Sequence, residues 1–569
     1  MAYWDRILTT RITRRRILRG AGAAGAAAGA IWIAGCSDSE RSVDGITPSA
    51  SAPPASDPTK PDYANPLDPP IAGGRYQAVA PAPFDSFDPH RGVGAATAVF
   101  PRIYNVLVQQ SAQRPQVSVF DLAESLENPD DVTWNFKIRP GVRIGPNDLG
   151  VPERDLDGDD VVATFERIKA IPEAPNGAFV KEFLAGVTAA SGSVTLTTTK
   201  PYAWLLSRVG NFVNTIPPRE LIADDGSIAK LVDRSAGAGP YRLVSASEGE
   251  AARLDRNPSY YLKDSAGTQL PYPEGIDIRT ITDRSAWRTA FVSGQVHQYT
   301  AEGKAEIDAL SSDFFVVKDP LAQFVPVAMN PEKPPFNDPR ARRAVSRAID
   351  RQQFVDRIYS GDAKPNGVVH WPAGEDSYAF SAQELEELQP FDVAEARSLV
   401  EALGGLKVKL VYPSGSTVAL HSSHVPIFVE QLKAANIDVD DTPLEFAAWL
   451  STYRVRDYEM SLGLTQVIET PEQPLNWHTS NGPLGDRSFG VGLGDPDIDA
   501  AIEKTKTVLD VEAGVKAVRD AQTLIYAKDL VFLPLVSGYS YNAYSNKVHN
   551  LPSGIGATAL FVNSVWIEG

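Results

Sequence analysis

One cysteine and two arginines near the N-terminus have the types and spacing of an export and lipidation signal. Arg14 and Arg15 precede residues 21–34, which are rich in Ala and Gly, and a twin arginine before such a segment is the address of proteins exported already folded. This segment of about 14 residues is too short to cross a bilayer as a helix. It leads into Ile-Ala-Gly-Cys, which ends at the sole cysteine, Cys36. This sequence has the form of a bacterial lipobox.

We therefore predict that residues 1–35 are a twin-arginine signal peptide and that the Cys36 thiol carries a lipid. The alternative is a chance Ala/Gly helix that ends in a buried cysteine. Because the only cysteine lies at this position, no disulfide is expected within the mature chain, whose stability must come from packing.

The other residues whose types suit catalysis or metal binding form weaker patterns. His421 and His424 are the only close pair among seven histidines, and no carboxylate pattern accompanies them, so we expect a solvated surface and no metal site. The carboxylates of 155–160 lack the length and the terminal Glu of a calcium loop, and capping at a helix N-terminus explains them. No phosphate-binding loop or nucleophile elbow occurs. We expect neither an enzyme nor a cofactor.

The amino-acid composition limits the kinds of partner that the protein can bind. The net charge is −17, and the basic leader makes the rest of the chain more acidic still, which argues against a nucleic-acid partner. After Cys36 no segment is long and apolar enough to span a membrane. Residues 36–72, rich in Pro, Ser and Asp, are predicted to be a disordered tether. The remaining body is long enough for two or three lobes.

The body alternates predicted strands and helices, which favours mixed sheets flanked by helices. Trp134, Phe136 and Ile138 alternate with polar residues, so 132–139 is predicted to be a half-buried strand. We assign Trp134 and Trp566 to the core. Further strands are predicted at 193–200 and 407–412. Helices with Asp or Asn at their start are predicted at 157–170, 337–361, 392–404 and 495–509, with another through 515–525.

Eight short segments occur in an order that identifies a family. They are Phe87-Asp-Pro-His90, Tyr104–Leu107, Leu122–Ser125 with Trp134–Val142, Asp160–Arg167, Gly237–Tyr241, Arg256–Tyr261, Met329–Asn330 with Pro335–Arg342, and Ala348–Asp350. Together they resemble the extracellular solute-binding proteins of family 5, the oligopeptide-, dipeptide- and nickel-binding receptors of ABC importers. The resemblance runs along nearly the whole body.

The resemblance implies an α/β fold of the periplasmic-binding-protein type, with two lobes, a hinge and an extra domain. Ligands would be enclosed by hinge closure. The chain is expected to cross between the lobes near Tyr299–Ala301 and near Leu535–Ser537. The implied division is lobe I at 73–108, 213–300 and 536–569, the extra domain at 109–212, and lobe II at 301–535.

The family places its ligand against two edges of the cleft, which here correspond to 91–95 and to the lobe II segment 463–471. Peptide-binding members carry an Asp four residues before Pro471 that pairs with the peptide amine, but this chain has Val467 there. Glu469 is only a partial replacement, so ordinary free peptides are in doubt. Aromatic residues suit stacking against a ligand, with core packing as the alternative. The candidates are Arg91, Gly92, Val93, Gly94, Ala95, Trp449, Thr465, Gln466, Val467, Glu469, Trp477, Phe489, Tyr539 and Tyr541.

The resemblance implies a monomeric lipoprotein at the outer face of the cytoplasmic membrane. It would capture a peptide-like or other small solute and deliver it to ABC permease subunits. The alternative is a sensor or chaperone-like binding protein of the same fold that works without an importer. A secreted hydrolase is disfavoured because the sequence has no catalytic constellation.

Overall fold

The computed structural model describes most of the chain between Tyr63 and Glu568. The predicted signal peptide and Cys36 lie outside the described residues. The residues not described are 1–62, 85–87, 92–98, 111–117, 172–173, 175, 224, 229–233, 248–250, 302, 311–313, 321–322, 325, 370–374, 415–418, 464–465, 468–469, 484–486, 488, 491, 529–530, 553–562 and 569.

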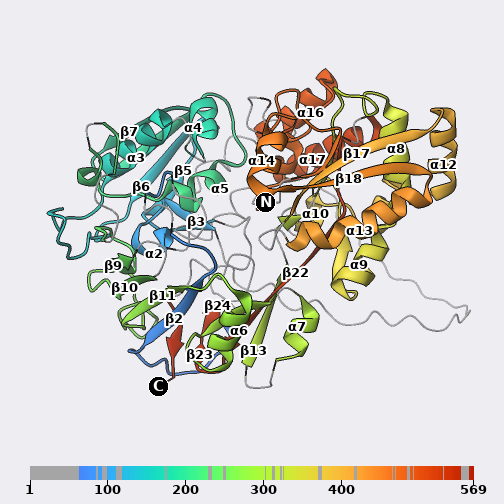
Figure 1. The fold of residues 1–569 in the computed structure, drawn as a ribbon. Coiled ribbons are helices and arrows are strands. Elements are labelled where there is room, and N and C mark those ends of the chain that lie inside the picture. Colours follow the sequence, from blue (N-terminus) through green and yellow to red (C-terminus); the bar gives the residue numbers. More distant parts are fainter. Residues whose placement is uncertain are drawn as a thin grey trace, which may run out of the picture.

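Two bodies lie side by side, and the strand β22 (Val536–Ser545) runs between them (Figure 1). The first holds the N-terminal half of the described chain and its C-terminal end, and the second holds most of residues 327–535. The α-helices with described bounds are α2 (Phe100–Ile103), α3 (Gly158–Ala170), α4 (Gly177–Phe183), α5 (Leu205–Val209), α6 (Arg284–Val292), α7 (Lys304–Asp308), α8 (Pro339–Ala348), α9 (Arg351–Tyr359), α10 (Glu375–Tyr378), α11 (Ala382–Leu388), α12 (Val393–Ala402), α13 (Ala419–Ala434), α14 (Phe446–Arg454), α15 (Glu472–Asn476), α16 (Pro496–Thr507) and α17 (Val511–Lys528).

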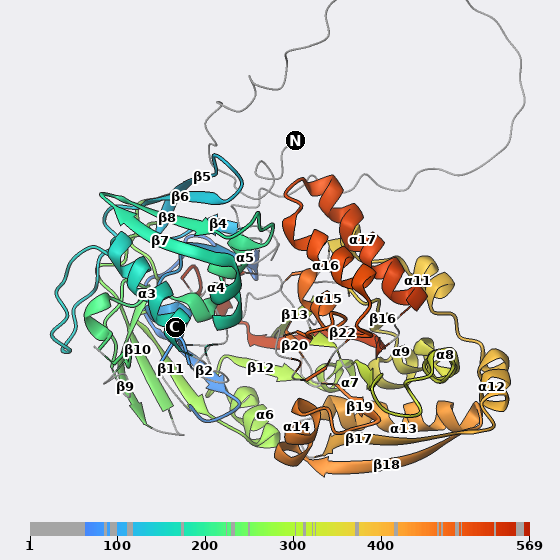
Figure 2. The ribbon, with the colours of Figure 1, turned by 90° about the horizontal axis from the view of Figure 1, so that it is seen from above.

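The first body contains two four-stranded sheets. One has the order β2–β11–β10–β9, in which only the β2–β11 pair is parallel. The other is antiparallel, has the order β5–β6–β8–β7, and packs against α3 and α4 (Figure 2). The bounds are β2 (Arg75–Ala80), β9 (Tyr241–Ser247), β10 (Ala251–Arg256), β11 (Gly275–Thr280), β5 (Ala123–Glu127), β6 (Thr133–Ile138), β7 (Leu184–Ala190) and β8 (Ser193–Thr198).

The second body is built on a mixed sheet with the order β18–β17–β19–β15–β21. A separate sheet, β12–β22–β13, joins the bodies, because the first residues of β22 pair with β16 and its later residues pair with β12 and β13. The bounds are β12 (Gln298–Ala301), β13 (Phe314–Pro320), β15 (Val327–Met329), β16 (Ala363–Pro365), β17 (Leu406–Ser414), β18 (Ile437–Glu445), β19 (Met460–Leu462) and β21 (Phe532–Leu533).

Short two-stranded ladders complete the fold. One of them pairs β1 with β24, and the Asn65 side chain donates to the carbonyl of Val548 at 2.8 Å. The described chain therefore begins inside the segment 36–72 that we predicted to be a tether. The ladders are β1 (Tyr63–Ala64) with β24 (Leu551–Pro552), β3 (Val108–Gln110) with β4 (Ser118–Phe120), β14 (Gln323–Phe324) with β20 (Gln466–Val467), and β23 (Val548–His549) with β25 (Trp566–Ile567).

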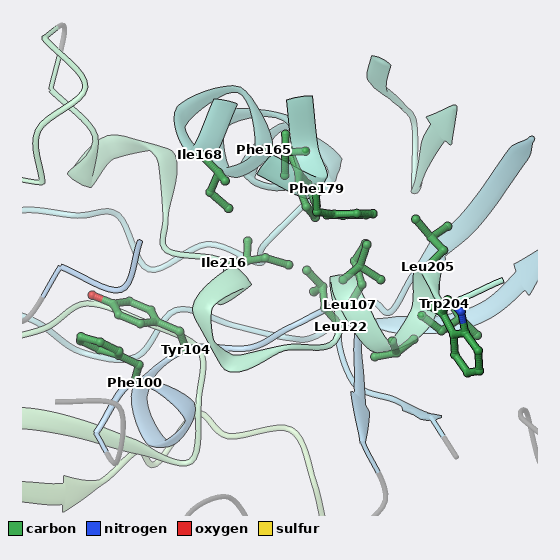
Figure 3. Packing of buried hydrophobic residues seen from close by; sticks show 14 of the residues in the cluster. Phe100, Tyr104, Leu107, Leu122, Phe165, Ile168, Phe179, Trp204, Leu205 and Ile216 are labelled. Atoms are coloured by element: carbon green, nitrogen blue, oxygen red, sulfur yellow. The ribbon is translucent and has the colours of Figure 1, made fainter. Parts of the chain in front are cut away.

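The predicted strand at 132–139 is confirmed as β6, whose Trp134, Phe136 and Ile138 are buried. Trp566 is buried as well, as predicted. The helix predicted at 157–170 is confirmed as α3, with Asp157 and Asp160 forming a capping box. Figure 3 shows Phe165 and Ile168 pointing from α3 toward Ile216, Leu107 and Leu122 in the core of the first body.

The single helix predicted over 337–361 is wrong, because the chain breaks into α8 and α9 at Ile349. Ile349 is extended, and the Asp350 side chain caps α9 by accepting from the amide of Gln352. Gln431 of α13 bonds both the amide and the carbonyl of Asp350 at 3.0 Å. This contact from a distant helix satisfies the backbone groups that a continuous helix would have paired internally.

Candidate ligand-binding site

A buried polar cluster precedes the first predicted ligand edge. Arg167 of α3 donates to both carboxylate oxygens of Asp88, at 2.8 and 2.5 Å, and to Nδ1 of His90 at 2.7 Å. Nε2 of His90 donates to the carbonyl of Thr215 at 2.9 Å. Burial and the Arg167 charge lower the pKa of His90 to about 4, so the ring is neutral at pH 7. The cluster fixes the chain immediately before residues 92–98.

The two bodies touch through the segment that leads into α5. The amide of Ala203 donates to the carbonyl of Lys506 at 2.7 Å, and the Trp204 indole donates to the carbonyl of Thr505 at 3.2 Å. The Trp204 ring also packs edge-on against Tyr378 at 5.8 Å. Because Trp204 is buried, opening the bodies at this point would expose a large apolar side chain to water.

A buried ion pair lies beside this contact. Arg208 and Glu472 meet at 2.7 Å, and the Tyr202 hydroxyl donates to the same Glu472 oxygen at 2.5 Å. Burial opposes the charge on Arg208, but Tyr202 and Glu472 outweigh burial and raise its pKa. Burial, with Glu472, also raises the pKa of Tyr202. At pH 7, Arg208 is therefore cationic and Tyr202 is neutral.

A pocket of about 360 Å³ lies next to the ion pair, between α4–α5 and α15–α16. On one side it is lined by Asn176, Phe179, Phe183 and the ion-pair residues Tyr202 and Arg208. The facing wall comes from residues 472–506 of the second body. Its volume falls in the range of small-molecule sites.

Three of the predicted aromatic residues belong to one cluster in the second body. Trp449 is fully buried; its indole donates to Oγ of Ser461 at 3.1 Å, and its ring stacks on Tyr453 at 5.2 Å. Trp477 is buried, and Phe489 is half-buried next to Tyr453. All three side chains contribute to packing, and their contact with a ligand stays a prediction.

Tyr539 lies apart from that cluster, on β22, with Nζ of Lys318 at 4.0 Å from its ring centre. The same Lys318 pairs with Asp362 at 2.7 Å, and the hydroxyl of Tyr541 donates to Asp362. Lys318, followed by Tyr541, lowers the pKa of Asp362. Through Asp362, these contacts hold the turn between α9 and β16 against the sheet that joins the bodies.

The remaining predicted ligand residues are described in part or not at all. Arg91 is half-exposed, and its Nε lies 3.8 Å from the Asp88 carboxylate. Gln466 and Val467 form β20, which pairs with β14. Gly92, Val93, Gly94, Ala95, Thr465 and Glu469 lie outside the described residues.

The expectation of a solvated surface at the histidine pair is wrong for His424. Its ring is buried on α13, stacks on Phe354 at 5.5 Å, and meets Tyr359 edge-on at 5.9 Å. Local sequence gave no sign of this, since α9 supplies both aromatic rings. No group of three or more His, Cys, Asp or Glu side chains is placed to hold a metal ion in the described part of the chain. No described helix is long and apolar enough to cross a membrane.

Sequence reasoning missed the Arg208–Glu472 pair and the pocket beside it. The two residues are 264 positions apart. The local sequence around each of them predicts only a charged surface side chain on a short helix. Only the docking of the two bodies brings them together.

Comparison with known proteins agrees with this architecture. The sequence model for "Bacterial extracellular solute-binding proteins, family 5 Middle" matches residues 119–485. The probable ABC transporter periplasmic-binding protein SapA of Escherichia coli K12 is 23% identical over 455 residues, which cover 76% of this chain and 81% of SapA.

Solved structures show the same fold. DppA of Helicobacter pylori, in complex with the peptide STSA, superposes with a TM-score of 0.71 at 21% identity, covering 88% of this chain and 99% of DppA. MoaA of Agrobacterium tumefaciens R10, in complex with mannopinic acid, gives a TM-score of 0.71 at 21% identity, covering 88% of this chain and 100% of MoaA. The predicted mixed α/β fold of the periplasmic-binding-protein type is therefore confirmed.

Proposed function

The chain belongs to the bacterial extracellular solute-binding proteins of family 5, and from this membership we propose that it captures a small solute between its two bodies and delivers it to an ABC permease. The observation that carries the proposal is the pocket of about 360 Å³ where the bodies meet. The family consists of substrate-binding receptors, and SapA is a probable ABC transporter component. The peptide held by DppA and the mannopinic acid held by MoaA indicate that one fold serves chemically different ligands.

We propose the lobe division given by the resemblance, with one adjustment. The antiparallel sheet β5–β6–β8–β7 lies within the proposed extra domain at 109–212. Strand β13 pairs with Tyr539–Ser545 of β22, on the same sheet as β12. We therefore place the start of lobe II after Pro320 and not at residue 301.

Capture is tested by mass spectrometry of protein purified from its host without denaturation. We expect a small molecule bound in a 1:1 ratio, which is released when the protein is unfolded. Protein that is free of any bound molecule, and that stays so after incubation with the small-molecule fraction of the growth medium, would contradict capture. The control is the same protein unfolded and refolded before incubation, which should regain the bound mass.

We further propose that the protein is held at the outer face of the cytoplasmic membrane by a lipid on Cys36, after export through the Arg14–Arg15 signal. Cys36→Ala should release the protein from membranes, because a thiol is needed for acylation. Changing Arg14 and Arg15 together to Lys should block export. Fractionation and intact-mass measurement check both results, and a Cys36→Ala protein that remained bound to membranes would refute the anchor.

A further inference from the structure

We propose that the two bodies turn where β22 passes from Gly538 to Tyr539, and that Arg351 and Asn366 position this pivot by holding the chain before it to the second body. The pivot is a property of the protein without solute, so it adds to the proposed capture and does not depend on it. We call residues 534–538, with the groups that hold them, the clamp.

The two ends of β22 are buried in different cores, as expected of a strand that runs between the bodies (Figure 1). Val536, at its start, lies in the core of the second body together with Leu533 and Leu535. Tyr541 and Ala543 lie in a core of the first body that side chains of α6 and β12 also form. The strand therefore changes from one body to the other between Val536 and Tyr541.

The pairing of β22 changes within the same stretch. Strand β16 of the second body pairs with Val536, Ser537 and Gly538. From Tyr539 onward the partner is β13, and β12 joins on the other side from Tyr541. The change of partner falls at the peptide bond between Gly538 and Tyr539, which we take as the pivot.

The chain crosses between the bodies a second time, between β13 and β15, and this crossing lies beside the first. Pro320 at the end of β13 is opposite Tyr539, and Val327 at the start of β15 is opposite Leu533. The two connections therefore leave the first body together and enter the second body together. Two short connections side by side permit turning about a single axis.

Arg351, in the first turn of α9, holds the chain immediately before β22. Its Nε donates to the carbonyl of Pro534 at 3.0 Å, and its Nη1 donates to the carbonyls of Gln389 and Ile349 at 3.3 and 3.5 Å. The side chain is 7% exposed. Burial lowers the pKa of Arg351 to about 10, so it remains cationic at pH 7. Its hydrogen bonds to described residues thus carry a charge, which strengthens them, and they fix the main chain of the clamp.

Asn366, which follows β16, holds the next residues. Its amide donates to the carbonyl of Leu535 at 3.0 Å, and its Nδ2 donates to Oγ of Ser537 at 2.6 Å. Its own carbonyl accepts from Nε2 of Gln389 at 2.8 Å. All these groups are buried, so water does not compete for them and the clamp moves with the second body.

The contacts on the two sides of the pivot differ in strength. Before it, Gly538 lies so close to Tyr359 of α9 that an added Cβ would overlap the ring. After it, Asp362 of the second body reaches across to Lys318 of β13, at 2.7 Å, and both side chains are partly exposed. An exposed ion pair contributes little, so this contact can break as the bodies turn while the buried clamp stays intact.

Three polar groups of the clamp are left for water. Nη2 of Arg351, Oδ1 of Asn366 and Oε1 of Gln389 are buried and have no hydrogen-bond partner among the described residues. Arg351 and Gln389 also line a cavity of about 350 Å³. Buried water usually satisfies groups of this kind. We therefore expect ordered water beside the clamp.

Hydrogen–deuterium exchange of Arg351→Met tests the clamp on mature protein that has been unfolded and refolded to remove any solute. Met leaves the carbonyls of Pro534 and Gln389 without their donor. We expect the amides of 534–538 to exchange at least about tenfold faster. The amides of 541–545, beyond the pivot, should be unchanged. Unchanged exchange at 534–538, or equally faster exchange at 541–545, would overturn the proposal.

The control is Ile437→Ala, which leaves a cavity on β18, at the edge of the second-body sheet farthest from β21. It should lower the free energy of unfolding without changing the exchange of 534–538 relative to the wild type. This control separates a local release of the clamp from a general loss of stability.

Small-angle X-ray scattering of the same solute-free proteins tests the positioning role. Arg351→Met should have a larger radius of gyration than the wild type, because the bodies take a wider range of angles when the strand is not held. Ile437→Ala should match the wild type. A radius of Arg351→Met equal to that of the wild type would overturn the positioning role.

A milder variant keeps the test valid if Arg351→Met does not fold. Ser537→Ala removes one buried hydroxyl, which accepts from Nδ2 of Asn366, so folding should be preserved. The amides of 534–538 should then exchange about threefold to tenfold faster, and unchanged exchange would overturn the proposal. Solute capture would survive that result, because it is judged by the molecule bound to the native protein.

Discussion

Lowering the pH from 7 to 4.5 is expected to reduce the free energy of unfolding by about 5 kcal/mol through two histidines, the buried His90 and the partly buried His297. Burial lowers the pKa of His90 to about 4, with a further contribution from Arg167. Burial lowers the pKa of His297 to about 4, with a further contribution from Lys547. Nδ1 of His297 accepts from the amide of Gln77 at 3.1 Å, which requires the neutral ring.

The sign follows from proton binding. An unfolded histidine has a pKa near 6.5, so between pH 6.5 and pH 4 the unfolded chain binds more protons than the folded one. The contribution of the two histidines to the free energy of unfolding is therefore fully present above about pH 6.5 and is lost as the pH falls toward 4. Paired carboxylates such as Asp277, whose pKa is lowered by Arg75 against the effect of burial, add to the loss at still lower pH.

Urea denaturation at pH 7 and at pH 4.5 measures this loss. Changing His90 and His297 together to Gln should remove most of the difference between the two pH values, because Gln supplies a donor and an acceptor without titrating. The control Val187→Ala, in strand β7, should lower stability equally at both pH values. Equal unfolding free energies of the wild type at pH 7 and pH 4.5 would refute the assignment.

Local patterns in the sequence were sufficient where local contacts decide the structure. The alternation that ends at Ile138 predicted β6, because one face of that strand is buried. Asp157 predicted the start of α3 by capping its first turn. Both features involve neighbours in the chain, so a single sequence reveals them.

Contacts between distant segments decide what the sequence did not predict. Gln431 pairs with the backbone of Asp350 from 81 positions away and divides α8 from α9. Arg208 and Glu472 become a pair only after both bodies have folded and docked. The candidate site therefore depends on tertiary arrangement, and periodicity carries no information about it.

A captured solute is expected to close the protein and to stabilise it. The contacts of Trp204 with Thr505 and of Arg208 with Glu472 join the two bodies, and the sheet containing β22 supplies the connection about which they can turn. Without ligand, these contacts and the burial of Trp204 oppose opening, whereas a ligand that touches both bodies adds contacts of its own. At a hundred times its dissociation constant a ligand adds about 2.7 kcal/mol to the free energy of unfolding.

The central claim is that this chain is a receptor that encloses a solute, and small-angle X-ray scattering tests it most directly. The protein is freed of ligand by unfolding and refolding, and scattering is recorded before and after addition of the solute recovered from native protein. The account predicts a smaller radius of gyration at saturation and a scattering curve that fits the arrangement in Figure 1. A radius that stays the same at saturating solute would contradict it.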